Sequence, residues 1–193
     1  MLEKLFISEV RVKILTLLLR DSEEKLHVRE IVRRVGAEIN AVRRELGRLT
    51  RLGLLKRQPV KNRLYYRVNG DFVLYPELLG LVAKETGLGK AVLEGRKELG
   101  DVEFAVLSRD LAQGRVATAE EVDLLLVGKI DTPALTKIVQ EAEAERGHEI
   151  NYTVMDHDEF EYRRSHKDPF LMKVLMQPRV VLIGDESQFC KFD

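Results

Sequence analysis

Two carboxylates stand one residue apart in the segment EVDLLLVG, residues 121–128: Glu121 and Asp123. The apolar run that follows them is typical of a buried β-strand, and side chains two residues apart in a strand point from the same face. Two carboxylates on one face could hold a divalent metal for phosphoryl chemistry. The segment therefore predicts either a working metal site or the remains of one.

Strands and helices alternate along the chain that surrounds these carboxylates. The expected strands are residues 102–108, 121–128, 149–155 and 179–184. Expected helices begin at an N-cap formed by Thr132 with Pro133 in the first position, at an N-cap formed by Asp156, and at residue 170. This alternation predicts an α/β domain over residues 101–193.

Four residues in these expected strands match the pattern of a catalytic motif: Leu107, Ser108, Glu121 and Asp123. Through them, residues 90–184 resemble the minimal nucleotidyltransferase fold of the DNA polymerase beta superfamily. That family places Gly-Ser at the end of its first strand and two carboxylates on its second. The resemblance implies a glycine that admits the triphosphate, a serine that binds phosphate, and carboxylates that hold Mg²⁺ together with a third.

The sequence departs from that pattern in three places. Leu107 stands where the glycine belongs, and Glu121 replaces the usual first aspartate. The third carboxylate is expected from residues 149–155, which offer only Glu149 at the strand edge and the uncharged Asn151. Because Mg²⁺ tolerates little geometric error, we expect a degenerate site at Ser108, Glu121 and Asp123 that has no catalytic residue and no bound metal. A plain alternative for Asp123 is a strand-end aspartate satisfied by backbone donors.

The charge of the chain is divided between its halves although the total is zero. Residues 1–70 contain 17 Lys and Arg against 8 Asp and Glu, whereas residues 71–193 contain 15 against 24. This division predicts two modules with different partners, of which the basic one faces a polyanion. Surface charge that happens to segregate is the alternative. Residues 29–67, with 12 cationic and 3 acidic side chains, argue against a purely protein-facing role.

The basic half has the pattern of three helices followed by a hairpin. Ser8 is a suitable N-cap for a helix over residues 8–19, and His27 for a helix over residues 28–35 that ends before Gly36. A third helix is expected over residues 39–52. Two strands, 54–60 and 64–70, follow it and are joined by the tripeptide KNR, in which Asn62 suits a turn.

The third helix has an aliphatic face and a cationic face. The expected core stripe consists of Ile39, Val42, Leu46 and Leu49. The opposite face carries Asn40, Arg43, Arg44 and Gly47, with Arg48 toward its edge. Arginine and asparagine on a free helix face can bond base edges in the major groove of DNA.

The hairpin adds cations that would lie beside phosphates, where they bind without reading sequence. These cations are Lys56, Arg57, Lys61 and Arg63. Two adjacent tyrosines, Tyr65 and Tyr66, are expected to pack within the hairpin, with one hydroxyl free for a phosphate.

Residues 7–69, which contain REIVRRVGAEINAVRRELGRLTRLGLLKRQPVKNRLYYRVN, resemble the winged helix-turn-helix repressors of the arsenic-type and multiple-antibiotic-type regulators. The shared pattern is a helix, a break, and a second helix that leads through Gly-Leu-Leu into the wing. The resemblance implies binding of double-stranded DNA through the third helix and a homodimer. The DNA-binding residues expected from it are Asn40, Arg43, Arg44, Arg48, Lys61 and Arg63.

The expected fold class is α+β, with a winged helix over residues 1–70, a helical linker over 71–100, and a nucleotidyltransferase-like domain with a mixed sheet over 101–193. The linker is expected to contribute to a dimer seam. Cys190 is the only cysteine, so no internal disulfide can form. No apolar run is long enough to span a membrane, and no signal pattern begins the chain, so we expect a cytoplasmic protein.

These observations predict a DNA-binding transcriptional regulator. Its C-terminal domain would sense a small-molecule or protein effector, or complete the dimer, and would require no cofactor. The alternative is a metal-dependent nucleotidyltransferase of the toxin–antitoxin type, which would use Mg²⁺ and a nucleotide and would be targeted by its winged helix. A third hypothesis is an RNA-binding adaptor.

Overall fold

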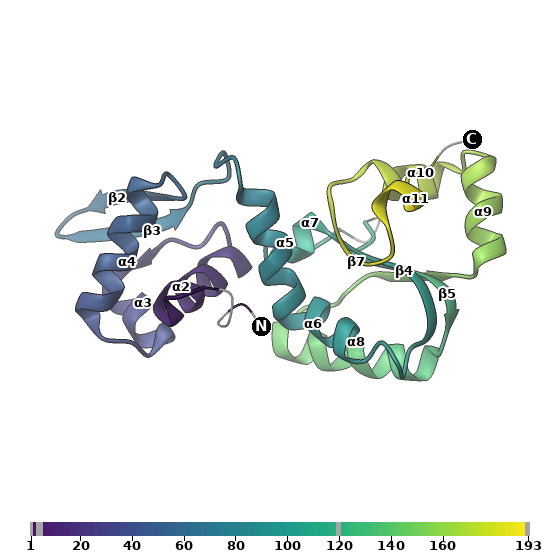
Figure 1. Ribbon diagram of the computed structural model, residues 1–193, viewed down its shortest axis with the longest axis horizontal. Helices are drawn as coiled ribbons and strands as arrows, with labels where there is room; N and C mark the ends of the chain where they lie inside the picture. Colours follow the sequence, from purple (N-terminus) through teal and green to yellow (C-terminus); the bar gives the residue numbers. More distant parts are fainter. Residues whose placement is uncertain (1, 3–5, 119–120, 192–193) are drawn as a thin grey trace. The chain divides into compact units, whose positions relative to one another are not determined.

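The computed structural model describes residues 2, 6–118 and 121–191. The chain forms two compact units, Met1–Glu85 and Thr86–Asp193 (Figure 1). The boundary falls inside the segment expected as a linker, between helices α5 (Tyr75–Glu85) and α6 (Gly87–Glu94). The first of these helices therefore belongs to the N-terminal unit and the second to the C-terminal unit. No helix in the described part of the chain is both long enough and apolar enough to cross a bilayer.

Before α5, the described part of the N-terminal unit contains helices, a short strand and a hairpin. These elements are α2 (Glu9–Arg20), β1 (Leu26–His27), α3 (Val28–Val35), α4 (Ile39–Arg51), β2 (Leu55–Val60) and β3 (Arg63–Val68). The expected caps of the first two helices are confirmed. The Ser8 hydroxyl accepts from the amide of Arg11 at 3.3 Å, and the His27 ring nitrogen accepts from the amide of Glu30 at 3.2 Å. Gly36 ends α3 in the left-handed conformation, with φ of 66°.

The three strands of this unit form an antiparallel sheet in the order β1-β3-β2. The hairpin is tighter than the tripeptide turn expected from the sequence, because Arg63 pairs with Val60 and only two residues connect the strands. The first of them, Lys61, has the positive φ of 51°, whereas the sequence had indicated only that Asn62 suits a turn. This two-residue turn fixes the register of every residue in the hairpin.

The C-terminal unit contains a four-stranded mixed sheet, which confirms the expected α+β class. Its strands are β4 (Gly100–Ser108), β5 (Leu124–Ile130), β6 (Tyr152–Met155) and β7 (Arg179–Ile183). In the order β6-β5-β4-β7, β5 and β6 run parallel while β4 is antiparallel to both of its neighbours. Two strands start later than expected, since β5 begins after Asp123 and β6 begins after Asn151.

The helices of the second unit cover this sheet. They are α6, α7 (Arg109–Ala112), α8 (Thr132–Arg146), α9 (His157–Ser165), α10 (Pro169–Met176) and α11 (Glu186–Phe189). Phe104 of β4 packs against Phe160 of α9 and Phe189 of α11, with ring centroids 5.8 and 5.4 Å away. The expected N-cap Thr132 is wrong by one residue. Asp131 caps α8, because its carboxylate accepts from the amide of Ala134 at 2.8 Å.

One glycine of β5 is required by the close approach of its neighbouring strand. Gly128 has φ of 135°, and a Cβ built there would lie 2.1 Å from the carbonyl oxygen of Asp101. The contact occurs beside the register shift between Val102 and Phe104 in β4. A bulge next to a glycine allows the two backbones to approach more closely than side chains permit.

We predict that Gly128→Ala destabilises the chain by about 1–3 kcal/mol, because a methyl group there meets backbone that cannot move aside. Gly147→Ala is the control. Gly147 also has a positive φ, of 78°, but a Cβ there meets nothing within 4 Å, so only the backbone strain of about 1 kcal/mol is expected. Urea unfolding followed by circular dichroism compares the two variants. Equal losses would contradict the role given to the close approach.

Candidate nucleic-acid interface

The exposed face of α4 is held in place by a buried stripe on its other side. Val42, Leu46 and Leu49 are buried as expected, whereas Ile39 is only partly buried. The N-cap is Glu38, whose carboxylate accepts from the amides of Asn40 and Ala41 at 2.8 and 2.9 Å. These two hydrogen bonds lower the pKa of Glu38. The sequence gave no signal for this cap, since glutamate is not among the favoured N-cap residues.

Three of the residues expected to bind DNA project from α4 without an ionic partner. Asn40, Arg43 and Arg44 are exposed. Neither arginine forms a hydrogen bond or an ion pair with another residue that the structure describes. Two guanidinium groups on a free helix face keep all their donors for an external acceptor.

Arg48 differs from these two because it is bound to a buried carboxylate. Its guanidinium donates to Glu45 at 2.8 Å, and the second oxygen of Glu45 accepts from Arg11 of α2, also at 2.8 Å. Burial opposes the ionisation of Glu45, yet the two guanidinium groups lower its pKa overall. The expected role of Arg48 in recognition therefore competes with a structural role that ties α4 to α2.

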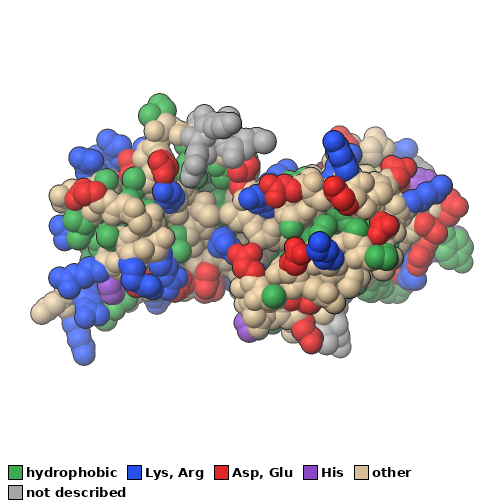
Figure 2. Space-filling view, turned by 90° about the horizontal axis from the view of Figure 1, so that it is seen from below, with side chains coloured by type: hydrophobic (Ala, Val, Ile, Leu, Met, Phe, Trp, Pro, Cys, Tyr) green, Lys and Arg blue, Asp and Glu red, His purple; other side chains and the backbone are tan. Residues whose placement is uncertain are grey.

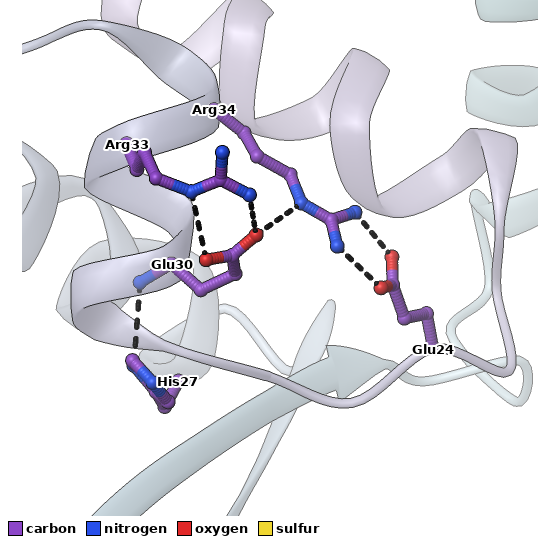
Figure 3. A network of polar contacts seen from close by, with 5 residues as sticks. All are labelled: Glu24, His27, Glu30, Arg33 and Arg34. Carbon is purple, nitrogen blue, oxygen red and sulfur yellow. Dashed lines mark hydrogen bonds and ion pairs between the residues drawn. The ribbon is translucent and has the colours of Figure 1, made fainter.

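Two arginines of α3, Arg33 and Arg34, are neutralised in a network on the surface (Figure 3). Glu30 accepts from Arg33 at 2.5 Å and from Arg34 at 2.7 Å, and Glu24 accepts from both terminal nitrogens of Arg34 at 2.8 Å. The hydrogen bonds from Arg33 and Arg34 lower the pKa of Glu30 to about 2. Since Glu30 also donates its amide to His27, the network and the helix cap share one residue.

The hairpin carries exposed cations on both of its faces. Because side chains alternate along a strand, the register places Arg57 on the face of Tyr66, while Lys56 and Arg63 lie on the other face. Lys61 lies at the turn, and Lys56 is held by Asp71 at 2.8 Å. Figure 2 shows Lys and Arg side chains gathered over the part of this unit that carries the hairpin. The sequence named Arg57 as a hairpin cation but could not place it on the α4 side.

The second candidate site does not bring its two carboxylates together on a strand face. Glu121 precedes β5 and bends back to Thr118, whose amide and hydroxyl donate to it at 2.8 and 3.0 Å. These bonds lower the pKa of Glu121. The expectation that Glu121 lies on a strand beside Asp123 is therefore wrong, because the backbone pairs as a strand only from Leu124 onward.

Asp123 is buried and satisfied by internal donors. Its carboxylate accepts from the amide of Asn151 at 3.1 Å and from the hydroxyl of Ser108 at 3.3 Å, while its side chain and backbone together are 1% exposed. Burial raises the pKa of Asp123, and the hydrogen bonds from Asn151 and Ser108 offset this only in part. The same Ser108 hydroxyl accepts from the amide of Leu111 and caps α7.

The remaining positions of the motif are also occupied by structural contacts. Leu107 is buried and pairs with Leu124 and Val180 in the neighbouring strands. The side-chain amide of Asn151 donates to the carbonyl of Thr118 at 2.9 Å. Among the described residues, no three acidic, histidine or cysteine side chains are grouped in a way that could hold a metal ion.

Comparison of the chain with protein-family models, with curated proteins and with solved structures gave no match.

The hydrogen bonds of Asp123 predict that the fold needs its hydrogen-bond acceptors and not its negative charge. Asp123→Ala should lower the free energy of unfolding by about 1–3 kcal/mol, because the Asn151 amide and the Ser108 hydroxyl lose their acceptor. Asp123→Asn can keep both contacts if its oxygen faces Asn151 and its amide donates to Ser108. We therefore expect it to be at least as stable as the wild type at pH 7.

The pH dependence checks the same assignment. The folded pKa of Asp123 is raised, so protonation stabilises the fold at low pH and this contribution is lost as the pH rises through the folded pKa. The advantage of Asp123→Asn over the wild type should thus shrink between pH 7 and pH 4 in urea unfolding. An advantage that grows on acidification would exclude the buried, destabilised carboxylate.

Proposed function

We propose that this protein is a DNA-binding transcriptional regulator whose N-terminal unit is a winged helix-turn-helix. The observation that carries the proposal is the free state of Arg43 and Arg44 on the exposed face of α4. Other arginines of the unit, Arg33, Arg34 and Arg48, have carboxylate partners. A helix that keeps unpaired guanidinium groups on one face and aliphatic side chains on the other suits insertion into the major groove.

In this proposal the helix and the hairpin have different tasks. Asn40, Arg43 and Arg44 reach base edges, where arginine binds guanine and asparagine binds adenine through two hydrogen bonds each. Lys61 and Arg63 of the hairpin lie beside phosphates and contribute affinity without sequence preference. A symmetric dimer would present two copies of α4 to successive turns of the major groove, as operators with two half-sites require.

The C-terminal unit is proposed as a degenerate nucleotidyltransferase-like domain that binds an effector or a partner, or completes the dimer. The internal bonds of Asp123 and Glu121 support this assignment. Mg²⁺ needs oxygen ligands in a nearly octahedral arrangement, and a carboxylate whose oxygens already accept from Asn151 and Ser108 is a poor ligand. We infer that the unit has kept the sheet of such enzymes and has lost their metal site.

The DNA-binding proposal predicts unequal effects of removing paired and unpaired arginines. Arg43→Ala and Arg44→Ala should each weaken binding to a selected duplex by about 1–3 kcal/mol, the value of a two-bond contact to a base. Arg33→Ala removes the same charge from the same unit, but the side chain that it removes is already bound to Glu30. We therefore expect the affinity for the duplex to change by less than about twofold. Fluorescence anisotropy with duplexes selected from a random pool by the full chain measures all three. Equal losses at Arg33 and Arg43 would show that only net charge matters.

The enzymatic alternative gives a separate prediction. The full chain, incubated with Mg²⁺, labelled nucleoside triphosphates and bacterial extract as the source of acceptors, should transfer no label, because the site offers no group of carboxylates to hold the metal. Asp123→Ala is the matched control. Label transferred by the wild type and lost in this variant would establish the transferase and overturn the assignment of a degenerate site.

A further inference from the structure

Tyr66 occupies the centre of the three-stranded sheet and links its core to its cationic rim. It pairs with Leu26 of β1 on one side and with Arg57 of β2 on the other. Residues paired across neighbouring strands point from the same face, so Leu26, Tyr66 and Arg57 form one row. Leu26 is buried and Arg57 is exposed, so Tyr66 lies between a core residue and a surface cation.

The hydroxyl of this tyrosine is an unused hydrogen-bonding group. Tyr66 is 8% exposed, yet its hydroxyl bonds to no residue that the structure describes. The Tyr66 hydroxyl still reaches solvent. It is not among the side-chain polar atoms of the described residues that are both fully enclosed and without a partner, a condition that Arg179 Nε meets. A buried tyrosine normally has a partner for its hydroxyl, and here the hydroxyl is open to solvent and to a partner from outside the chain.

Arg57 lies beside Tyr66 on the neighbouring strand, and its charge acts on this hydroxyl. Burial raises the pKa of Tyr66, while the charges of Arg57 and Arg43 act on it in the opposite direction. The phenol therefore stays protonated at neutral pH and can donate. Arg57 comes from β2 and Arg43 from α4, which packs on β2, and neither has an ionic partner among the described residues. Tyr66 and Arg57 thus place two hydrogen-bond donors side by side, and neither has an acceptor among the described residues.

We propose that Tyr66 and Arg57 form a subsite for one phosphodiester group of the nucleic-acid backbone, on the face of the hairpin that carries Tyr66. The inference rests on the proposed DNA-binding function and assigns a residue and an anchor point to it. The guanidinium group of Arg57 neutralises the phosphate, and the phenol donates to one of its oxygens. Because the ring of Tyr66 is fixed in the core, the subsite sets the depth and angle at which α4 enters the groove.

A phosphate contact does not depend on base sequence, so an arbitrary 25-base-pair duplex tests the subsite without knowledge of the operator. The full chain is titrated by fluorescence anisotropy at several NaCl concentrations. Tyr66→Phe keeps the packed ring and removes only the hydroxyl, and a loss of affinity of about fivefold is expected with an unchanged salt dependence. Arg57→Ala should instead reduce the slope of log affinity against log salt by about 0.9.

Tyr65→Phe is the matched control, because Tyr65 lies on the other face of the same strand, edge-on to the ring of His27. Its affinity should match that of the wild type. The double variant Tyr66→Phe/Arg57→Ala should lose less than the two single losses combined, since both groups hold the same phosphate. Inorganic phosphate should also compete better against the wild type than sodium chloride of equal ionic strength does.

The possible results distinguish the phosphodiester subsite from the proposed DNA-binding function. If the wild type binds duplex DNA and Tyr66→Phe binds equally well, the subsite is refuted while the proposed function stands. Equal losses for Tyr65→Phe and Tyr66→Phe would also refute it, because the face of the strand would not matter. If the wild type binds no duplex at any salt concentration, the proposed function is refuted and the phosphodiester subsite with it.

Discussion

The cationic surface of the N-terminal unit depends on where its few carboxylates lie. Between residues 29 and 67 there are three of them, and each is occupied. Glu30 holds Arg33 and Arg34, Glu38 caps α4, and Glu45 joins Arg11 to Arg48. An ion-paired guanidinium has fewer donors left for an external phosphate or base. The pairing therefore concentrates the free positive charge on the middle of α4 and on the hairpin.

In the C-terminal unit, too, internal hydrogen bonds decide which groups are free, and here they occupy the carboxylate that the sequence suggested for chemistry. Asp123 is enclosed, and its oxygens face donors that belong to the fold. The cost of an enclosed charge is reduced by these donors, which at the same time remove the lone pairs that a metal would need. Asp123, a candidate for chemistry in the sequence, instead joins the start of β5, the start of α7 and the segment before β6 in the folded chain.

The sequence predicts local features well where one residue decides them. Ser8, His27 and Gly36 act at the helix ends where they were expected, because cap chemistry depends on side-chain type and on its nearest amides. Asp131 and Thr132 can both cap a helix, and only the backbone of the folded chain selects the aspartate. The α+β class and the mixed sheet follow from the alternation of elements. The winged-helix and nucleotidyltransferase-like resemblances stay predictions.

The functional surface was harder to predict because it depends on register. A tripeptide turn leaves Arg63 outside the strands, whereas the actual two-residue turn places it in β3, opposite Val60. A shift of one residue exchanges the two faces of a strand, so the sequence could not show that Arg57 shares a face with Tyr66. The pairing of Glu45 with Arg48 was visible as an i, i+3 spacing, but the burial of Glu45 and its bond to Arg11 depend on the packing of α2 against α4.

The hairpin has one more property that follows from its position in the sheet. β2 is an outer strand, and the outer edge of a sheet exposes peptide groups to which another chain can add. Pro59 removes one of the amide donors from β2, and the exposed charges of Lys56 and Arg57 repel an identical strand brought alongside. The side chains that would attract a polyanion thus also protect the protein from sheet extension and aggregation.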